Sequence, residues 1–261
     1  MTHPWAKASM SKTRQNLVDL VIPVYNEARV LEGSLRRLLR EMDECRDFQW
    51  RIVIVNNGST DDTAELARRL ADELAPVQFI DIAQKGRGRA LRTAWSQTDA
   101  EMSIYMDVDL STGLAAVPGA VAELRSGADV VVGSRTRSDS RITRCFKREF
   151  LSRAYNRLIR WVLRTRSFDD AQCGFKGVRV EAVRRLLPLV KNQDWFFDTE
   201  LLVLAEYAGL TIRTLPITWV EDPDSRVNIP RTILQDLGGL ARLRIKGRST
   251  ARRLRDEHED S

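Results

Sequence analysis

Short apolar runs alternate with amphipathic stretches through the first half of the chain. The apolar runs occupy 17–24, 51–55, 77–82, 102–109 and 128–133, and each predicts a buried strand. The stretch after the first run carries apolar residues at positions 30, 31, 35, 38, 39 and 42, which is helical spacing. Thr60 is the expected N-cap of the next helix. Strands that alternate with helices predict an α/β fold with a mostly parallel, doubly wound sheet.

The second half is less regular. Residues 144–166 predict one long helix, CGFKGVRV is strand-like, 181–189 and 195–208 predict helices, and 210–220 predicts a strand. No repeat or low-complexity linker separates the halves, so we expect one domain over 17–245, with a nucleotide-binding half at 17–135. Residues 1–16 are expected to form a flexible leader and 246–261 a charged tail.

Composition excludes several classes of protein. An apolar fraction of 43% with 30% charged residues is that of an ordinary folded domain. There is no run of 18 apolar residues, which argues against a transmembrane span, and the first 16 residues do not form a signal peptide. Three cysteines without a CxxC pair and two histidines exclude a disulfide framework and a structural zinc site, and fit a reducing cytosol.

The positive charge is concentrated in one band. The chain has 42 Lys and Arg against 36 Asp and Glu, but residues 134–168 alone hold 11 Lys and Arg and 2 Asp and Glu. This band carries +9, so the remaining residues sum to −3. Such a band predicts a localised anionic partner. No helix-turn-helix, RRM or zinc-finger pattern accompanies it, so nucleic acid is not the expected partner.

Two aspartates end the fourth predicted strand, in MDVDLS. Asp107 and Asp109 are two residues apart, so on a strand they share a face and can converge on one hard cation, Mg²⁺ or Mn²⁺. Ligands of open α/β sheets bind beyond the carboxyl ends of the strands, which is where both carboxylates are expected. Taken alone, the pair can equally be two solvated aspartates of a turn.

The other strand ends also carry polar chemistry. PVYNE, NNGSTDD, KGRGRA and GSR follow the first, second, third and fifth predicted strands. In KGRGRA, Gly86 and Gly88 permit a close backbone approach to phosphate, while Lys85 and Arg87 bring positive charge. Arg135 of GSR is a further candidate. The first turn is PVYNEA rather than GxGxxG, which disfavours a dinucleotide-binding enzyme.

The order of these motifs resembles the inverting GT-A-fold glycosyltransferases. RxxLSRxYNxL, DDAQCGFKG, WFFDTELL and WVEDPDSRV extend the resemblance to the polyprenyl- and dolichyl-phosphate hexosyltransferases, and DxQCGFK is most similar to their dolichyl-phosphate glucosyltransferase branch. The resemblance covers about residues 18–245, and it implies an acceptor half at 136–245.

The resemblance also implies roles for individual residues. The nucleotide pocket would comprise Pro23, Tyr25, Asn26, Glu27, Asn56, Asn57, Lys85, Gly86 and Asp107. Asp107 and Asp109 would surround the diphosphate and its metal, and Arg226 would clamp the diphosphate. The sugar and acceptor would meet Arg135, Gln172, Lys176, Trp195 and Glu200, with Asp198 as a candidate for orienting the acceptor or serving as a base.

Two positions depart from the family pattern. Asn57 stands where the pattern has Asp, and beside Asn56 its amide can accept from uracil N3–H and donate to O4, which favours uridine. Ser111 stands where the mannosyl branch commonly has Gln, which weakens a mannose assignment.

The expected activity is inverting transfer of a hexose, foremost glucose from UDP-glucose, to polyprenyl or dolichyl phosphate. Alternatives are GDP-mannose as donor, a soluble hydroxyl acceptor, or a basic membrane-docking module without catalysis. We expect peripheral attachment to the cytoplasmic face of an anionic membrane through the 144–166 helix. Its apolar face would hold Leu151, Tyr155, Leu158 and Val162, and its membrane side Arg153, Arg157, Arg160 and Arg164 with Phe146, Phe150 and Trp161.

Overall fold

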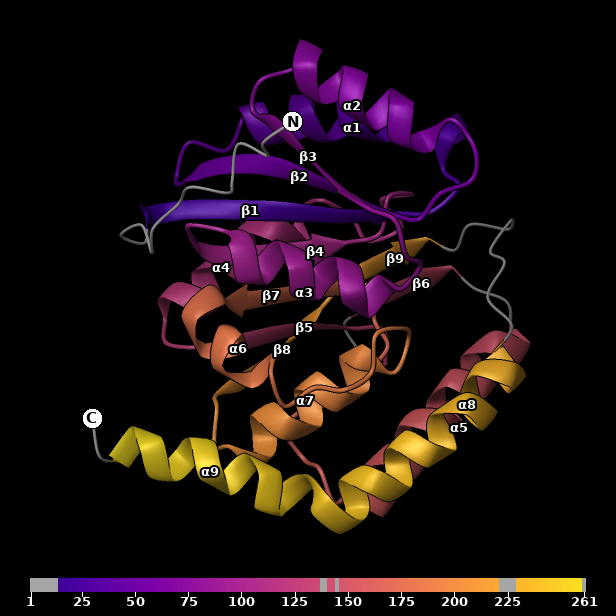
Figure 1. Ribbon diagram of the computed structural model, residues 1–261, viewed down its shortest axis with the longest axis vertical. Helices are drawn as coiled ribbons and strands as arrows, with labels where there is room; N and C mark the ends of the chain where they lie inside the picture. Colours follow the sequence, from indigo (N-terminus) through magenta and orange to yellow (C-terminus); the bar gives the residue numbers. More distant parts are fainter. Residues whose placement is uncertain (1–13, 137–139, 144–145, 221–228, 260–261) are drawn as a thin grey trace.

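The computed structural model describes residues 14–136, 140–143, 146–220 and 229–259 (Figure 1). The strands are β1 (Arg14–Val24), β2 (Gln49–Asn57), β3 (Val77–Ile82), β4 (Ala100–Met106), β5 (Val130–Ser134), β6 (Arg141–Thr143), β7 (Phe175–Arg179), β8 (Ile212–Pro216) and β9 (Thr218–Val220). The helices are α1 (Ala28–Asp43), α2 (Thr63–Glu73), α3 (Arg87–Gln97), α4 (Ala116–Arg125), α5 (Phe146–Leu163), α6 (Val180–Leu186), α7 (Phe197–Tyr207), α8 (Ile229–Arg242), the π-helical turn η1 (Leu243–Gly247) and α9 (Arg248–Glu259).

One sheet joins strands from both halves of the chain. Seven strands lie in the order β3-β2-β1-β4-β7-β5-β8, and β6 pairs with β9 in a separate two-stranded ladder. The neighbours are parallel except for β7, which runs antiparallel between β4 and β5. The expected mostly parallel α/β sheet is therefore confirmed. The carboxyl ends of β1, β2, β3, β4 and β5 meet at one edge, which is where the polar motifs lie.

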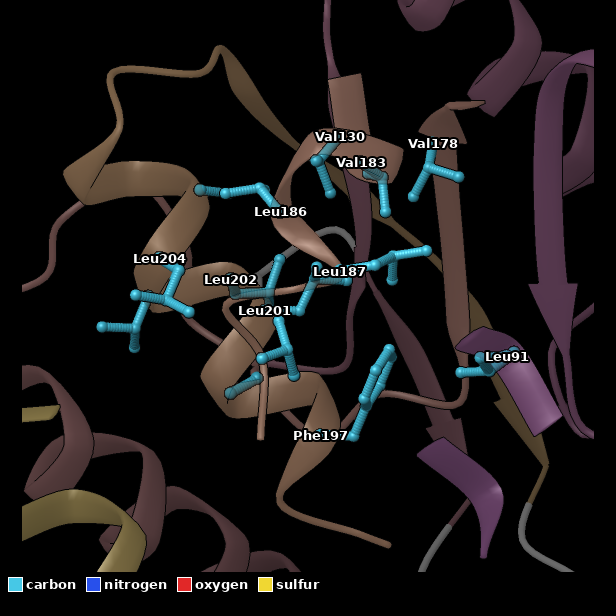
Figure 2. Packing of buried hydrophobic residues seen from close by; sticks show 14 of the residues in the cluster. Leu91, Val130, Val178, Val183, Leu186, Leu187, Phe197, Leu201, Leu202 and Leu204 are labelled. Atoms are coloured by element: carbon cyan, nitrogen blue, oxygen red, sulfur yellow. The ribbon is translucent and has the colours of Figure 1, made fainter. Parts of the chain in front are cut away.

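A hydrophobic core lies on each face of the sheet. In β1, Leu20 and Ile22 belong to the core that includes α1, α2 and α4, while Val21 between them belongs to the other. The second core includes α3, α6 and α7, and Figure 2 shows Leu91 and Phe197 within it. This packing fixes the first turn of α7, which carries site residues.

Helix α9, within the segment expected to form a charged tail, packs against the core. Ala251 of α9 is fully buried and Leu254 packs against the core, although the domain was expected to end at 245. Leu243, Gly247, Ala251 and Leu254 recur every three or four residues, so they form one helical stripe that packs beside α7. The high charge of the surrounding residues obscures this stripe in the sequence.

Helices α5 and α8 lie side by side at one side of the molecule (Figure 1). Tyr155, Ile159 and Leu163 form the buried stripe of α5, whereas Leu158 and Val162 are only half-buried. The expected apolar face is thus displaced by about one residue. The side chains of Phe146, Phe150 and Leu151 lie outside the described part of the chain. Within the residues described, no helix combines the length and apolarity needed to cross a membrane.

A buried hydrogen bond joins these two helices. The Tyr155 hydroxyl donates to Asp236 Oδ2 at 2.6 Å. Burial raises the pKa of Asp236 to about 6, from 3.8, and the Tyr155 hydrogen bond only partly opposes this shift. The folded protein therefore holds this proton more tightly than the unfolded chain. It follows that Asp236 stabilises the fold most below its unfolded pKa, and that this stability is lost as the pH rises toward 6.

We expect Asp236→Asn to flatten this pH dependence. The amide keeps an oxygen that accepts from Tyr155 but cannot ionise, so the wild-type loss between pH 5 and pH 8, about 1 kcal/mol, should disappear. Urea unfolding at both pH values measures it, with Asp43→Asn on the exposed surface of α1 as the control. If the free energy of unfolding of Asp236→Asn still falls between pH 5 and pH 8 as much as that of the wild type, Asp236 is not the source of this pH dependence.

Candidate active site

Asn26 ties the loop after β1 to the loop after β2. Its backbone is left-handed, with φ of 57°, and its side chain accepts from Thr60 N at 2.8 Å and donates to Thr60 Oγ1 at 3.2 Å. The Glu27 amide donates to Thr63 Oγ1 at 2.8 Å. The prediction that Thr60 caps α2 was wrong: the helix begins at Thr63, and Thr60 pairs with Asn26 instead.

The two asparagines at the end of β2 hydrogen-bond to the protein itself. Asn57 donates to Val24 O at 2.9 Å and accepts from Gly86 N at 3.2 Å, so it braces three strand ends. Asn56 donates to Asp81 Oδ1 at 2.7 Å and accepts from Ser59 N at 3.2 Å. Each amide therefore already makes one donated and one accepted hydrogen bond within the protein, and the expected contact with uracil stays a prediction.

The loop after β3 brings a cation against an aromatic ring. Lys85 Nζ lies 3.6 Å from the ring centre of Tyr25, beside the half-buried Pro23 at the end of β1. Gly86 has φ of 152°, and a Cβ there would lie 2.6 Å from the carbonyl oxygen of Gln193. Glycine is thus required where this loop enters α3.

The two aspartates lie in a turn rather than on a strand. β4 ends at Met106, and Leu110, with φ of 52°, reverses the chain, so the expected strand over 102–109 is three residues too long. Asp109 is exposed and accepts from Ser111 N at 2.9 Å. The side chain of Asp107 is 34% exposed and accepts from the Tyr105 hydroxyl at 3.1 Å. Both carboxylates nevertheless reach the crevice edge.

Asp107 occupies space that only a glycine leaves open. A Cβ on Gly174 would lie 1.7 Å from Asp107 Oδ2, so any other residue at 174 would displace the carboxylate. Burial raises the pKa of Asp107; the Arg87 guanidinium opposes this shift and the charge of Asp109 adds to it. A bound cation would relieve the repulsion between the two carboxylates.

A buried ion cluster lies beneath Asp107. Arg87 pairs with Asp198 Oδ2 and lies 3.9 Å from Asp107 Oδ1. Lys176 Nζ lies 3.4 Å from Asp198 Oδ1 and donates to Cys173 O at 2.5 Å. The side chains of Lys176 and Asp198 are both 0% exposed. Lys176 and Asp198 therefore hold the cluster together from within and do not face the crevice.

Arg87 is held on its other sides by aromatic rings. Its guanidinium carbon lies 4.3 Å from the ring centre of Trp195 and 5.3 Å from that of Tyr105. Burial lowers the pKa of Arg87, but the neighbouring Tyr105, Asp198 and Asp107 outweigh it and raise the pKa. Arg87 is thus a fixed cation between the carboxylate turn and α7.

Arg135 is paired just as firmly. Its Nε and Nη2 donate to the two carboxylate oxygens of Asp170 at 2.8 and 2.9 Å, and its amide donates to Oδ2 at 3.1 Å. Burial would raise the pKa of Asp170, but Arg135 outweighs it and lowers the pKa. The guanidinium carbon also lies 5.0 Å from the ring centre of Trp219. Arg135 joins the ends of β5 and the 169–174 loop.

The remaining acceptor-side residues divide into surface and interior. Trp195 is 40% exposed and Gln172 is half-buried, so both border solvent. Glu200 is buried, accepts from Asn192 N at 2.8 Å and pairs with Arg242 at 2.7 Å, so it braces α7 against α8. Arg226 lies outside the described residues.

Sequence reasoning missed four residues of this site as individual candidates. Arg87 stood in KGRGRA, where only its charge was noted, and Asp170 and Gly174 stood in DDAQCGFKG without a role. Tyr105 precedes the aspartate pair as an apparently ordinary strand residue. The only sequence signal at position 174 is a glycine directly before an aromatic residue. This pattern does not say which side chain fills the space that the glycine leaves open. That this side chain is Asp107 follows only from the pairing of β4 with β7.

The arrangement can bind a diphosphate together with a divalent cation. Asp107 and Asp109 lie in the turn after β4, Arg87 lies 3.9 Å from Asp107, and Lys85 adds a cation in the loop after β3. In the part of the chain that the structure describes, no group of three or more acidic, cysteine or histidine side chains is placed to hold a metal. The remaining ligands of a cation at Asp107 and Asp109 would therefore come from phosphate oxygens and water.

Solved structures of the same fold support this reading of the architecture. Glucosyl-3-phosphoglycerate synthase from Mycobacterium tuberculosis, solved with Mn²⁺ and UDP-glucose, superposes with a TM-score of 0.62 over 88% of this chain and 79% of that one, at 16% identity. Its complex with UDP gives a TM-score of 0.59 over 91% and 80% of the two chains, at 19% identity.

Curated relatives are more similar in sequence. The chain is 36% identical to glycosyltransferase AglD of Haloferax volcanii over 83% of its own length and 35% of that protein. It is 30% identical to dolichyl-phosphate beta-glucosyltransferase ALG5C of Trichomonas vaginalis, with coverage of 80% and 65%. The Saccharomyces cerevisiae dolichyl-phosphate beta-glucosyltransferase is 26% identical, with coverage of 80% and 69%. The chain thus spans about a third of the first of these relatives and just under two thirds of the second.

The model of the family described as "Glycosyl transferase family 2" matches residues 19–187, from the second half of β1 through the end of α6. This match includes the carboxylate turn, the KGRGRA loop and the Asp170–Lys176 segment. The chain therefore belongs to glycosyl transferase family 2.

Proposed function

We propose that this chain transfers a hexose, foremost glucose from UDP-glucose, to the phosphate of a polyprenyl or dolichyl lipid with inversion. The observation that carries the proposal is the carboxylate turn at Asp107 and Asp109 backed by the Arg87–Asp198–Lys176 cluster. Relatives named dolichyl-phosphate beta-glucosyltransferases support the acceptor and the sugar. The solved structure that holds UDP-glucose and Mn²⁺ in the same fold supports the donor and the cation.

The donor set of the carboxylate turn fits Mg²⁺ or Mn²⁺. Both ions prefer carboxylate and phosphate oxygens, and Gly174 keeps the space that Asp107 needs. Asp107 and Asp109 would hold the cation against the diphosphate. Bound there, the ion would supply charge neutralisation for the departing nucleoside diphosphate.

The protein's own residues position the two reactants. Arg87 is pre-oriented by Asp198 and Trp195, so it can stabilise charge near Asp107 without reorganising. The acceptor phosphate is already an anion at neutral pH and needs little help from a base. Catalysis then rests on orientation and on electrostatic stabilisation. Exposed Trp195 and half-buried Gln172 border the sugar side, and Arg226 is proposed to close over the diphosphate.

A donor and acceptor panel tests the proposal. We expect release of UDP from UDP-glucose only when polyprenyl phosphate is present, loss of turnover with EDTA, and recovery with Mg²⁺ or Mn²⁺. Preference for GDP-mannose would overturn the donor assignment. Turnover with a soluble hydroxyl acceptor but not with lipid phosphate would overturn the acceptor assignment. Full activity in excess EDTA would overturn the requirement for a divalent cation.

A further inference from the structure

A polar hollow lies at the C-terminal end of α5. Its volume is about 510 Å³, and its lining residues are Arg157, Arg160, Trp161, Arg164, Thr165 and Arg166. Figure 1 shows α5 leading away from β6 toward the bend at which α8 passes into η1. None of these residues belongs to the candidate active site. We call this site the α5 hollow.

The positive charge of the α5 hollow is not neutralised by the protein. Across the part of the chain described, no carboxylate pairs with the guanidinium groups of its four arginines, and no acidic residue lines it. Some exposed arginines elsewhere are paired, as Arg36 is with Glu32 and Arg37 with Glu41. Four like charges around one hollow attract an anion.

Thr165 adds a buried hydrogen-bonding group. The residue is 3% exposed, borders the hollow, and its hydroxyl has no hydrogen-bond partner among the described residues. The turn that places it is fixed: Arg164 has φ of 56°, and the Arg166 and Ser167 amides donate to Glu206 at 2.8 and 3.0 Å. A buried hydroxyl without a partner is costly, and a phosphate oxygen would accept its proton.

One exposed apolar side chain lines this charged hollow, and two more lie on the helices that contact α5. Trp161 is 80% exposed, Ile245 of η1 77%, and Leu237 of α8 46%. These are three of the six large apolar residues exposed in the described chain, and their helices α5, α8 and η1 contact one another. A soluble phosphate ligand gives no reason to expose an indole in the lining and an isoleucine on the adjoining η1. A bilayer interface accommodates arginine, tryptophan and phosphate together.

We propose that the α5 hollow binds the phosphate headgroup of an anionic lipid, with Trp161 and Ile245 inserted at the bilayer surface. Arg157, Arg160 and Arg164 hold the phosphate, and Thr165 donates to it. Of the basic band, Arg153 is exposed but does not line the hollow. This inference does not rest on the donor, the sugar or the metal of the proposed function.

Vesicle co-sedimentation of the full chain tests the charge. The vesicles contain phosphatidylcholine with or without phosphatidylglycerol and no polyprenyl phosphate, so the assay is independent of glycosyl transfer. We expect binding only to the anionic vesicles, falling as salt rises. Arg157→Gln/Arg160→Gln/Arg164→Gln should lower partitioning on the order of a hundredfold, about fivefold per arginine. The matched control, Arg36→Gln/Arg40→Gln/Arg46→Gln, removes the same charge from α1 and the loop after it and should bind as wild type.

Thr165→Val tests the hollow itself. We expect several-fold weaker binding to anionic vesicles with an equal or higher melting temperature, because the change removes a buried hydroxyl that lacks a partner. Failure of the wild type to bind, or equal loss in the control variant, would overturn the proposal. Binding of soluble inositol hexakisphosphate without vesicle binding would overturn it in favour of a soluble polyanion.

Discussion

Asp107→Asn should lower kcat/KM on the order of 10² to 10³-fold, the loss expected for one electrostatic stabiliser of a transition state. The amide keeps the size of the side chain and can still accept from the Tyr105 hydroxyl. What it loses is the charge that would hold the cation against the diphosphate. Steady-state UDP release and Mn²⁺ binding followed by electron paramagnetic resonance measure the two consequences separately.

Gly174→Ala should reproduce this loss without changing any charge. The new Cβ would lie 1.7 Å from Asp107 Oδ2, so the carboxylate must leave its position. The control is Gly33→Ala in α1, where no atom lies within 4 Å of the new Cβ; it should leave activity unchanged and stabilise the helix by up to about 1 kcal/mol. Wild-type turnover and Mn²⁺ affinity in Gly174→Ala would show that Asp107 does not act from this position.

The α/β alternation and the polar strand ends could be predicted because both follow from local pattern. Apolar runs of strand length identify the segments that form the sheet. The carboxyl ends of parallel strands then lie at the same edge of that sheet. The position of β7 could not be predicted in this way, because its antiparallel insertion between β4 and β5 depends on contacts across about 45 to 75 residues. Yet this insertion places Gly174 against Asp107 and Lys176 against Asp198.

Motif matching identified polar residues but not the direction that each faces. Glu200 was expected in the acceptor-side wall and Lys176 near the sugar or acceptor phosphate, yet both are buried in ion pairs. Arg135 is locked to Asp170, and Asn57 to the neighbouring loops. A polar residue in a motif can either bind the substrate or hold the residue that binds it. The exposure of its side chain distinguishes these two roles. Trp195 and Gln172 retain the exposure that contact requires.

The burial of Asp198 leads to the second large prediction. Arg87 and Lys176 contribute two positive charges, and Asp198 and Asp107 two negative ones, so the cluster is balanced. Asp198→Asn leaves Lys176 fully buried without an ion pair among the described residues, and the more distant carboxylate of Asp170 is already paired with Arg135. Removing one partner of a buried pair costs about 3–5 kcal/mol, so we expect the free energy of unfolding to fall by this amount. Urea denaturation measures it.

A double variant separates positioning from base catalysis. Asp198→Asn/Lys176→Met leaves one cation, Arg87, facing one carboxylate, Asp107, so the balance of charge returns. We expect it to recover most of the unfolding free energy, since neutral replacement of a buried ion pair is often close to neutral. If Asp198 only positions Arg87, turnover of the double variant should return to within about tenfold of wild type, because the amide oxygen introduced at 198 can still accept from Arg87, which also faces Asp107 and Trp195. A general base contributes 10² to 10⁴-fold, roughly, and its loss cannot be repaired at position 176. A double variant that is stable but still impaired by at least about 10²-fold, with an altered pH profile of kcat, would assign Asp198 to catalysis instead.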